Sequence, residues 1–549
     1  MTVNTLIRIK NLSVPFDDET SLKILAARRL KIAPRLVSEV KVARRALDCR
    51  LYRGAPVSWV YTLDVNLAES ERSILTRHRR DKNIGLAHDA PQLIDWSKFS
   101  PRTDKRPIVV GFGPAGMLAA WALAKAGLNP LVLERGLPVK ERALAVENFW
   151  RRGVLNPRGN AQFGEGGAGT FSDGKLTYRG DDPLCVEVLD LFINAGAPEE
   201  IRFLAKPHIG TDRLRKMVEG LREEIISLGG EVRFNCQVTD FVLTEGRVNS
   251  IIVNNSDEIK ADAVFLAIGH SARDTYRVLE AKGVALEPKP FAVGVRIEHP
   301  QEFIDSAQYK EAAKTGKLPA ADYRLTYNDN MSGRSAYSFC MCPGGRVVAA
   351  ASESGQVVTN GMSVYARDSG AANAALVVNV LPTDFAGGAL AGIRFQEQYE
   401  QAAFRLGGEN FFAPVQSVGD FLAGKSGSKD FLLAPSYAPG VTCADLREAL
   451  PPFVSRTLAA ALPDFDRKIP GFSAADVPLV GVETRTSAPC RILRDRQTYE
   501  SQSTPGLYPI GEGAGYAGGI MSAAIDGLRV VLSFFAGQRA SGGLRGAAP

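Results

Sequence analysis

The chain has few of the residues that build metal or disulfide frameworks. It holds five histidines and seven cysteines in 549 residues. The histidines are dispersed, the cysteine number is odd, and no Cys-x-x-Cys pair occurs. A disulfide framework and a structural zinc site are therefore disfavoured, and we expect no metal centre.

Long apolar runs are also missing. No uninterrupted apolar run reaches the roughly 18 residues that a membrane span needs. Near the start, Arg8 and Lys10 interrupt the apolar residues that a signal peptide would keep together. We expect a cytoplasmic protein without a membrane span, and its 45% hydrophobic and 23% charged content is ordinary for a globular chain.

Positive charge is concentrated at the N-terminal end. Residues 1–105 hold 20 Lys and Arg against 12 Asp and Glu, whereas the whole chain has a net charge of +6. Residues 1–98 carry strand-like and helix-like patterns in turn, which predicts a separate α+β domain, ferredoxin-like, before a polar linker over residues 95–107.

A basic cluster in this first domain has two interpretations. It is either a nucleic-acid face or, more plainly, a solvated basic surface or a patch that docks on an acidic partner. No RNP-type aromatic run or helix-turn-helix pattern accompanies it, so nucleic-acid binding is the less favoured of the two. The cluster consists of Arg28, Arg29, Lys31, Arg35, Lys41, Arg44, Arg45, Arg50 and Arg53.

The strongest pattern lies between Arg106 and Gly136. An apolar strand over residues 108–110 is followed by Gly-x-Gly-x-x-Gly, a helix and a second apolar strand that ends at Glu134. In such a β-α-β unit the first glycine permits the turn, the second lets a pyrophosphate approach the backbone, and the third allows close packing. The acid accepts hydrogen bonds from ribose hydroxyls. The segment therefore predicts a dinucleotide-binding site.

Two further glycine-rich stretches suggest contact with the same ligand. Residues 159–175 contain six glycines, so backbone amides there can approach a flat or anionic group; a plain surface loop is the alternative. Residues 506–521 lead into a helical run from Ser522 to Phe535, whose positive N-terminal end would stabilise a reduced flavin. We expect Gly113 and Gly519 to serve one ligand.

These motifs together resemble those of a known protein family. The stretches IVVGFGPAGMLAA, GEGGAGTFSDGKL, ADAVFLAIGHSA and GLYPIGEGAGYAGGI are similar to those of the uncharacterised bacterial FAD-dependent dehydrogenases of the glutathione-reductase-like flavoprotein superfamily. The resemblance covers essentially the whole chain. It implies FAD as the tightly held cofactor, with NAD(P)H as a possible transient electron donor, and it names no substrate.

The resemblance also implies which residues hold the cofactor. The pyrophosphate would lie on Gly111, Gly113, Pro114, Ala115 and Gly116, the ribose beside Glu134 and Arg135, and the adenine near Val238. Ala267 and Gly269 would close over the cofactor. The glycine-rich loop would contribute Gly166 and Gly167, and Gly511, Glu512, Gly519, Ile520 and Met521 would line the flavin end.

Catalytic candidates are fewer. His208 precedes a glycine turn and is either a group that orients or protonates substrate or a structural histidine. Arg485, with Glu483 and Arg491, either binds an anionic substrate group or forms a salt-bridged surface cluster. Cys340 and Cys342 lie one residue apart on a predicted strand and are either an electron relay or buried structural thiols.

We expect an α/β protein with three parts. Residues 1–98 form the N-terminal domain, residues 105–287 and 477–540 the Rossmann-type FAD-binding domain, and residues 288–476 an inserted α+β substrate or cap domain. The predicted function is that of an FAD-dependent oxidoreductase, which passes hydride between a small-molecule substrate or NAD(P)H and flavin N5. The alternatives are a flavin-dependent monooxygenase and a nucleic-acid-binding flavoprotein. The oligomeric state is not predicted.

Overall fold

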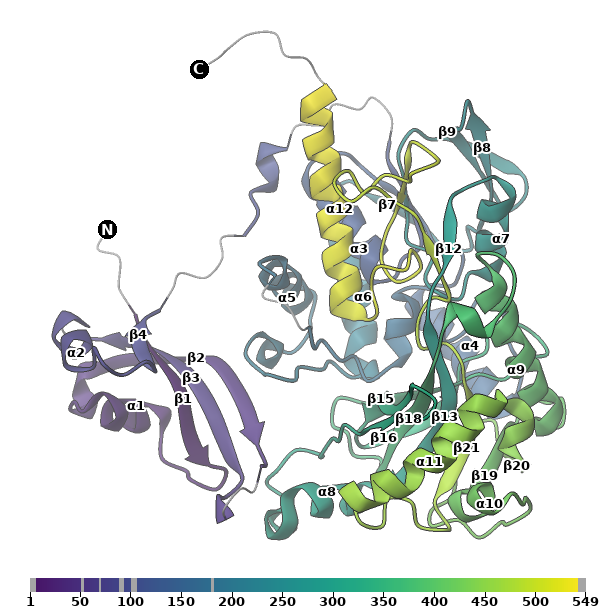
Figure 1. Ribbon diagram of the computed structural model, residues 1–549. Helices are drawn as coiled ribbons and strands as arrows, with labels where there is room; N and C mark the ends of the chain where they lie inside the picture. Colours follow the sequence, from purple (N-terminus) through teal and green to yellow (C-terminus); the bar gives the residue numbers. More distant parts are fainter. Residues whose placement is uncertain are drawn as a thin grey trace.

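The computed structural model describes residues 6–50, 54–68, 71–87, 93–99, 106–178 and 182–541. Arg53 of the predicted basic cluster and residues 100–105 of the predicted linker lie outside the described residues. Figure 1 shows a small N-terminal unit beside a larger body, in which the C-terminal helix lies against the nucleotide-binding sheet.

The N-terminal unit has the predicted ferredoxin-like topology. Its elements follow in the order β1 (Ile7–Pro15), α1 (Leu22–Leu30), β2 (Val37–Asp48), β3 (Ser58–Leu67), α2 (Glu71–Arg77) and β4 (Ile84–Leu86). The strands form an antiparallel sheet in the order β2-β3-β1-β4. Ile7, Ile9, Leu63 and Val65 alternate onto one face and are fully buried with the helical residues Ala27 and Leu30.

The body is built on a parallel sheet of the Rossmann type. The strand order is β23 (Leu507–Pro509), β11 (Val264–Leu266), β5 (Ile108–Val110), β6 (Leu131–Leu133) and β7 (Glu231–Arg233), and every neighbouring pair is parallel. All residues of β5, β6 and β11 are buried, as expected for strands covered on both faces. The fold class predicted from the sequence is confirmed.

Helices pack on one face of this sheet. They are α3 (Pro114–Lys125), α6 (Thr211–Ser227) and α12 (Ile520–Ser541), and their apolar residues share one core with β5 and β6. Helix α6 begins at Thr211, and Gly210 occupies its N-cap with φ of +79°. The smaller sheet β8 (Val238–Thr244), β9 (Arg247–Val253) and β10 (Asp257–Lys260) shares a second core with β5, β6 and β11.

One helix is long and apolar enough to cross a membrane by length and composition. This is the window Ile520–Gly537 of α12, with a mean hydropathy of 1.5. In the structure 61% of the window is buried, and it contains the ion-paired residues Asp526 and Arg529. Its packing against α3 and β11 is that of a core helix.

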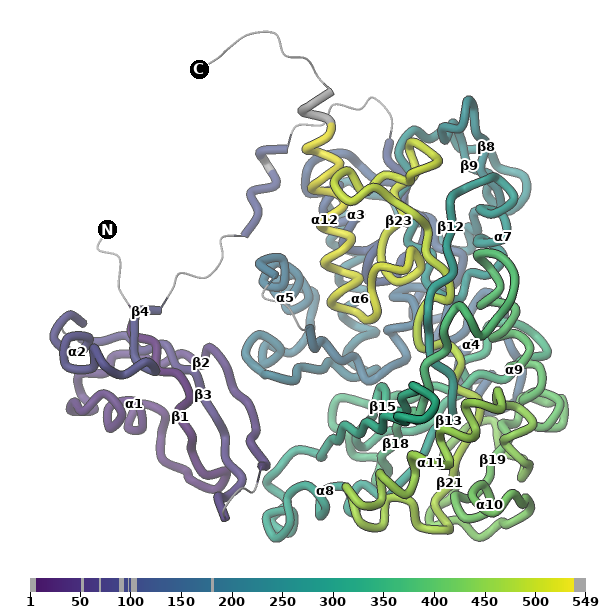
Figure 2. The backbone as a smooth tube through the Cα atoms, in the orientation of Figure 1, coloured from purple at the N-terminus to yellow at the C-terminus, as the bar shows by residue number. Residues whose placement is uncertain are grey.

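The long middle of the chain forms a second, mixed sheet. Its seven strands are ordered β14 (Thr326–Asp329), β15 (Arg334–Cys342), β18 (Ala371–Val380), β13 (Phe291–Pro300), β21 (Pro478–Glu483), β19 (Ala413–Ser417) and β20 (Val441–Cys443). Figure 2 shows the chain entering this region through β12 (Leu286–Pro288) and β13 and returning to the first sheet with β23 and α12.

Helices and a hairpin complete this region. They are α8 (Gln301–Tyr309), α9 (Ala391–Gly407), α10 (Val418–Ala423), α11 (Pro452–Lys468), and the pair β16 (Gly345–Ala349) and β17 (Thr359–Ser363). Strand β12 pairs with β22 (Cys490–Ile492) beside the first sheet. Three helices of the nucleotide-binding part remain: α4 (Val139–Arg152), α5 (Leu184–Asn194) and α7 (Arg273–Ala281).

The N-terminal unit touches the body through strand β2. The backbone of Arg45 donates to Phe203 O at 2.7 Å and accepts from Ala205 N–H at 2.9 Å, which forms a parallel β-bridge with Leu204. The Arg45 guanidinium lies over the rings of Trp59 and Phe203. This contact brings the unit to the rim of the cavity described below.

Candidate functional site

One large cavity, of about 1640 Å³, lies where the two sheets meet. It exceeds the roughly 300–1,000 Å³ of ordinary ligand pockets, so it has room for a dinucleotide and a second small molecule. Residues from both ends of the glycine-rich pattern line it, among them Gly113 and Gly519. Two turns that are far apart in the sequence therefore face one ligand space.

The cavity wall at Gly113 is a cradle for an anion. Gly113 is the N-cap of α3, and none of the described side chains caps it, so the first N–H groups of the helix point toward the cavity. A methyl group built on Gly113 would meet only the Cα of Gly167, at 3.7 Å. The space beside this backbone is open, as a pyrophosphate site requires.

Neighbouring glycines serve packing instead. A methyl group on Gly116 would lie 2.0 Å from Gly111 O, and one on Gly166 would lie 2.0 Å from Thr170 Oγ1. Gly111 has φ of +97° and a methyl there would lie 2.4 Å from Ala267 O. Of these, Gly111 also lines the cavity, whereas Gly116 and Gly166 lie one layer behind its wall.

The Glu134 carboxylate holds three loops together at the cavity edge. It is 5% exposed and accepts the N–H groups of Phe112 and Gly136 at 2.8 Å and of Gly164 at 3.0 Å. Because a carboxylate has about four acceptor positions, one remains for a ligand hydroxyl. Arg135 lies beside it, paired with Asp274 at 2.8 Å and placed over the Phe163 ring.

The predicted adenine and closing residues lie in the same wall. Val238, Ala267 and Gly269 all line the cavity, and Gly269 has φ of +69°. The Tyr276 hydroxyl donates to Gly269 O at 3.3 Å and to Gly513 O at 2.6 Å, which ties this loop to the C-terminal glycine loop.

A buried ion pair fixes the C-terminal loop. Asp526 on α12 accepts Gly511 N–H at 2.7 Å and pairs with Arg494 at 2.7 and 2.9 Å. Gly511 packs behind the wall, where a methyl would lie 2.6 Å from the Ala115 Cβ, so the two glycine motifs are in direct contact. Glu512, Gly519, Ile520 and Met521 line the cavity, and burial raises the pKa of Glu512 to about 7.

The residues present fit FAD. The open backbone at Gly113, the uncapped start of α3 and the remaining acceptor position of Glu134 match a diphosphate and a ribose. The start of α12 and its glycines lie at another part of the same cavity. A single extended dinucleotide accounts for both features.

His208 is the predicted catalytic residue that most clearly faces the cavity. Its ring stacks on Tyr365, with Nε2 3.1 Å from Tyr365 O, and it lies next to Lys175 through an antiparallel bridge. Burial, helped by the Arg367 guanidinium, lowers the pKa of His208. The imidazole is therefore neutral near pH 7 and can accept a proton.

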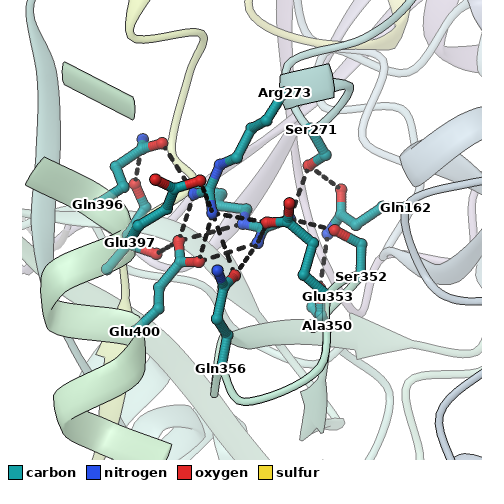
Figure 3. A network of polar contacts seen from close by, with 12 residues as sticks. Gln162, Ser271, Arg273, Ala350, Ser352, Glu353, Gln356, Gln396, Glu397 and Glu400 are labelled. Carbon is teal, nitrogen blue, oxygen red and sulfur yellow. Dashed lines mark hydrogen bonds and ion pairs between the residues drawn. The ribbon is translucent and has the colours of Figure 1, made fainter. Parts of the chain in front are cut away.

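The structure separates Arg485 from the grouping with Glu483 and Arg491 that the sequence suggested. Figure 3 shows the buried network around Arg273 and Glu400, to which Arg485 also belongs. Arg485 is 9% exposed and pairs with Glu400 at 2.9 Å, while it donates to Ser352 at 2.6 Å and Ser271 at 3.1 Å. Burial alone would raise the pKa of Glu400, but the Arg273 and Arg485 guanidinium groups hold it well below its usual value.

Glu483 and Arg491 have other partners. Glu483 pairs with the fully buried Arg296 at 2.8 and 2.9 Å, and burial, only partly offset by Arg296, raises its pKa. Arg491 pairs with Glu287 at 2.6 Å. The predicted cluster is therefore wrong as a group, because each member is bound to a different carboxylate or guanidinium, although Glu483 and Arg485 both reach the cavity lining.

Cys340, a candidate electron relay in the sequence, lines the cavity where the mixed sheet meets the glycine-rich loop. Several other lining residues were not identified from the sequence as parts of the site. Lys175, Tyr323 and Asn360 lie near Cys340, and the N-terminal unit adds Arg45, Leu47 and Trp59. Lys175 is the last residue of the glycine-rich loop, and this position could have indicated that it belongs to the site. The others come from segments that are far apart in the sequence, and no local pattern joins them.

Fold and site together define a Rossmann-type dinucleotide-binding protein with a large second sheet over the cavity. Residues 290–486 match the family model described as FAD-dependent protein, C-terminal domain-like. An uncharacterized protein from Clostridium beijerinckii is 47% identical over 526 residues, which cover 95% of this chain and 97% of the relative. The chain belongs to the same family as this relative.

Solved structures are more distant. A geranylgeranyl bacteriochlorophyll reductase-like protein from Thermoplasma acidophilum is 14% identical, with 79% of each chain covered and a TM-score of 0.36. The structure of CtdE in complex with FAD is 13% identical and covers 79% of this chain and 85% of that one, with a TM-score of 0.30.

Proposed function

We propose that the protein is a cytoplasmic FAD-dependent oxidoreductase that transfers hydride between a small-molecule substrate, or NAD(P)H, and flavin N5. The observation that carries this proposal is the shared cavity of the two glycine turns, at Gly113 and at Gly519. The match of residues 290–486 to the C-terminal domain family of FAD-dependent proteins supports the cofactor. The wider assignment to the glutathione-reductase-like superfamily stays a prediction.

Each part of the fold has a separate role in the proposed reaction. In this proposal residues 105–287 and 477–540 hold the cofactor, residues 288–476 cover the reaction space, and residues 1–98 close one rim. FAD supplies the hydride chemistry when it is bound. The chain binds the pyrophosphate at the start of α3, orients the ribose through Glu134 and keeps water out with the second sheet.

Among the predicted catalytic residues, His208 is proposed to contact the substrate. Its neutral imidazole faces the cavity beside Lys175 and can hold or accept a proton. Arg485 and Glu483 are proposed as positioning residues, because their charges are bound to Glu400 and Arg296 inside the protein.

The test is anaerobic reduction of the purified full-length protein. We expect it to retain FAD through gel filtration and its visible flavin band to bleach with NADH, NADPH or an organic hydride donor from a panel. The variant His208→Asn should keep the flavin but reduce it more slowly with the substrate, by about 100-fold or more if the imidazole transfers a proton. A colourless protein that does not take up added FAD would overturn the proposal.

A further inference from the structure

The cavity has a second chemical feature, which the hydride proposal does not use. On the mixed sheet, opposite the glycine-rich loop, strand β15 ends in Cys340 and Cys342. Cys340 lines the cavity and is partly exposed, whereas Cys342 is fully buried behind it. Both thiols are free.

The backbone at Cys340 departs from regular strand geometry. The pairing of β15 with β18 shifts register between Phe339 and Cys342, and Cys340 has φ of +43°. A non-glycine residue in this left-handed region is costly, and such positions occur at sites where a side chain must be redirected.

The two thiols are placed to interact with each other. The Cys342 thiol donates to the backbone oxygen of Cys340 at 3.2 Å, so the two residues are held next to each other. The Cys342 hydrogen bond, the Lys175 ammonium and the Arg296 guanidinium hold the pKa of Cys340 well below its ordinary value despite burial. For the same pair, burial and the neighbouring thiolate raise the pKa of Cys342.

Two cations lie beside the pair, the partly exposed Lys175 and the fully buried Arg296. Lys175 Nζ lies 3.8 Å from Cys342 Sγ and 2.9 Å from Asp173, and Arg296 donates to Cys340 O at 3.2 Å. Positive groups of this kind favour a thiolate over a thiol. A thiolate beside a second thiol is the arrangement that performs thiol–disulfide exchange.

A buried hydroxyl points to a ligand at the same place. Tyr323 lines the cavity, is 8% exposed, and its hydroxyl has no hydrogen-bond partner among the described residues. An orphaned buried hydroxyl costs about 1–3 kcal/mol unless a bound molecule satisfies it. Its partner is therefore expected on a substrate that enters beside the cysteines.

We propose that Cys340 and Cys342 form a dithiol/disulfide couple that reduces a small-molecule disulfide in the FAD cavity. This inference rests on the proposed function, which supplies the reducing equivalents. It assigns the substrate class to the flavoenzyme, and it uses a pair on the mixed sheet, outside the dinucleotide-binding unit.

The electron balance is complete. The Cys340 thiolate attacks one sulfur of the disulfide RSSR, forms a mixed disulfide and releases RS⁻, which takes up a proton as RSH. The Cys342 thiol then gives up its proton and attacks Cys340, which releases the second RSH and leaves a Cys340–Cys342 disulfide. Bound FAD, once reduced, would supply the two electrons that, together with two protons, restore the two thiols. Lys175 balances the thiolate charge throughout.

The first test is thiol mapping on the prereduced full-length protein. Iodoacetamide at pH 6.5 should label Cys340 about tenfold or more faster than Cys236, which lines the same cavity but whose pKa burial raises. Lys175→Gln should slow this labelling and Lys175→Arg should restore it, at unchanged melting temperature. Equal rates for Cys340 and Cys236 would overturn the proposal.

The second test follows the disulfide. Trypsin releases residues 335–346, which contain both cysteines. After oxidised glutathione is added as the probe, this peptide should lose two hydrogens in the wild type and carry one glutathione on Cys340 in the Cys342→Ser variant. If the mass of this peptide does not change in either protein, the proposed Cys340–Cys342 couple is contradicted.

A reductive titration separates this inference from the proposed function. With FAD bound, the oxidised wild type should take up twice as many electrons per flavin as Cys342→Ser. If both proteins bind flavin and take up the same number of electrons, the dithiol couple is contradicted and the proposed oxidoreductase function is not. If the thiols are reactive but the protein binds no FAD, the proposed oxidoreductase function is contradicted and the reactivity of the cysteine pair is not.

Discussion

Gly167 lies against Gly113: a methyl group built on Gly167 would come 3.0 Å from the Gly113 Cα. The glycine-rich loop is therefore held close to the start of α3, and the two backbones together form the wall where we place the pyrophosphate. The glycines near this point have different surroundings, so their replacement by alanine should affect either FAD affinity or the stability of the apoprotein.

The variant Gly113→Ala should fold normally and lose FAD affinity by about tenfold or more. Gly113 has φ of −86°, which alanine adopts easily, and the new methyl meets only an ordinary contact at 3.7 Å. It would occupy the space of the ligand. The measurements are the apoprotein melting temperature and FAD titration by fluorescence, and an unchanged affinity would refute the cradle.

Gly116→Ala, three residues away, should behave in the opposite manner. Its methyl would lie 2.0 Å from Gly111 O, so the helix must shift and the apoprotein should be destabilised by about 1–3 kcal/mol. Gly85→Ala, with open space around its methyl, is the matched control and should leave both stability and affinity unchanged. Denaturant unfolding of the three apoproteins checks this contrast.

Asp526→Ala should lower stability by about 3–5 kcal/mol. The substitution leaves the buried Arg494 guanidinium unpaired and removes the acceptor of Gly511 N–H. Arg467→Ala, which breaks the exposed pair with Asp464, should cost no more than about 0.5 kcal/mol. Urea denaturation followed by circular dichroism measures both, and similar losses for the two variants would contradict the role given to Asp526.

Glu400→Gln should destabilise the protein by about 3 kcal/mol, because Arg273 and Arg485 would both lose their shared carboxylate. Glu397→Gln is the control: Glu397 pairs mainly with Arg277, which is half exposed, so its loss should be small. Thermal melts compare the two variants. Loss of flavin reduction in Arg485→Met without loss of stability would instead favour a direct contact of Arg485 with the substrate.

The pH dependence of stability should carry the signature of Glu298. This carboxyl is fully buried, and burial raises its pKa to about 7 although Ser436 donates to it. Between the unfolded pKa near 4.3 and pH 7 the folded state binds the extra proton, so stability falls as pH rises through that window. The contribution is up to about 3 kcal/mol.

The variant Glu298→Gln tests this assignment. It should flatten the fall of the unfolding free energy between pH 5 and pH 7, with little effect below pH 4.5. Urea titrations at several pH values measure the slope. A variant with the same slope as the wild type would assign the pH dependence to Glu165 or Glu512, whose pKa values burial also raises to about 7.

Much of the cradle could be predicted from the sequence because glycine spacing reports backbone geometry directly. Gly111, Gly113 and Glu134 lie within one β-α-β unit, so their relation is local. The ferredoxin-like unit was predictable for the same reason, since its alternating residues such as Ile7 and Ile9 mark the buried face.

The reaction end of the cavity could not be predicted in this way. Lys175, Tyr323 and Cys340 meet only because the mixed sheet folds back over the glycine-rich loop, and no periodicity records that approach. Arg485 and Glu483 were misgrouped because neighbours in sequence on and after β21 point to different partners, Glu400 and Arg296. Charged residues close in sequence say little about which of them share a site.

The pairing of β11 with β23 has a consequence for synthesis. These adjacent strands are separated by more than 240 residues, and Gly511 meets Ala115 only after the whole mixed sheet has been made. Contacts between such distant segments form slowly. The ribosome must therefore synthesise almost the entire polypeptide before β23 can pair with β11 and complete the cavity wall. A chain that ends before residue 507 lacks β23 and leaves that edge of β11 unpaired.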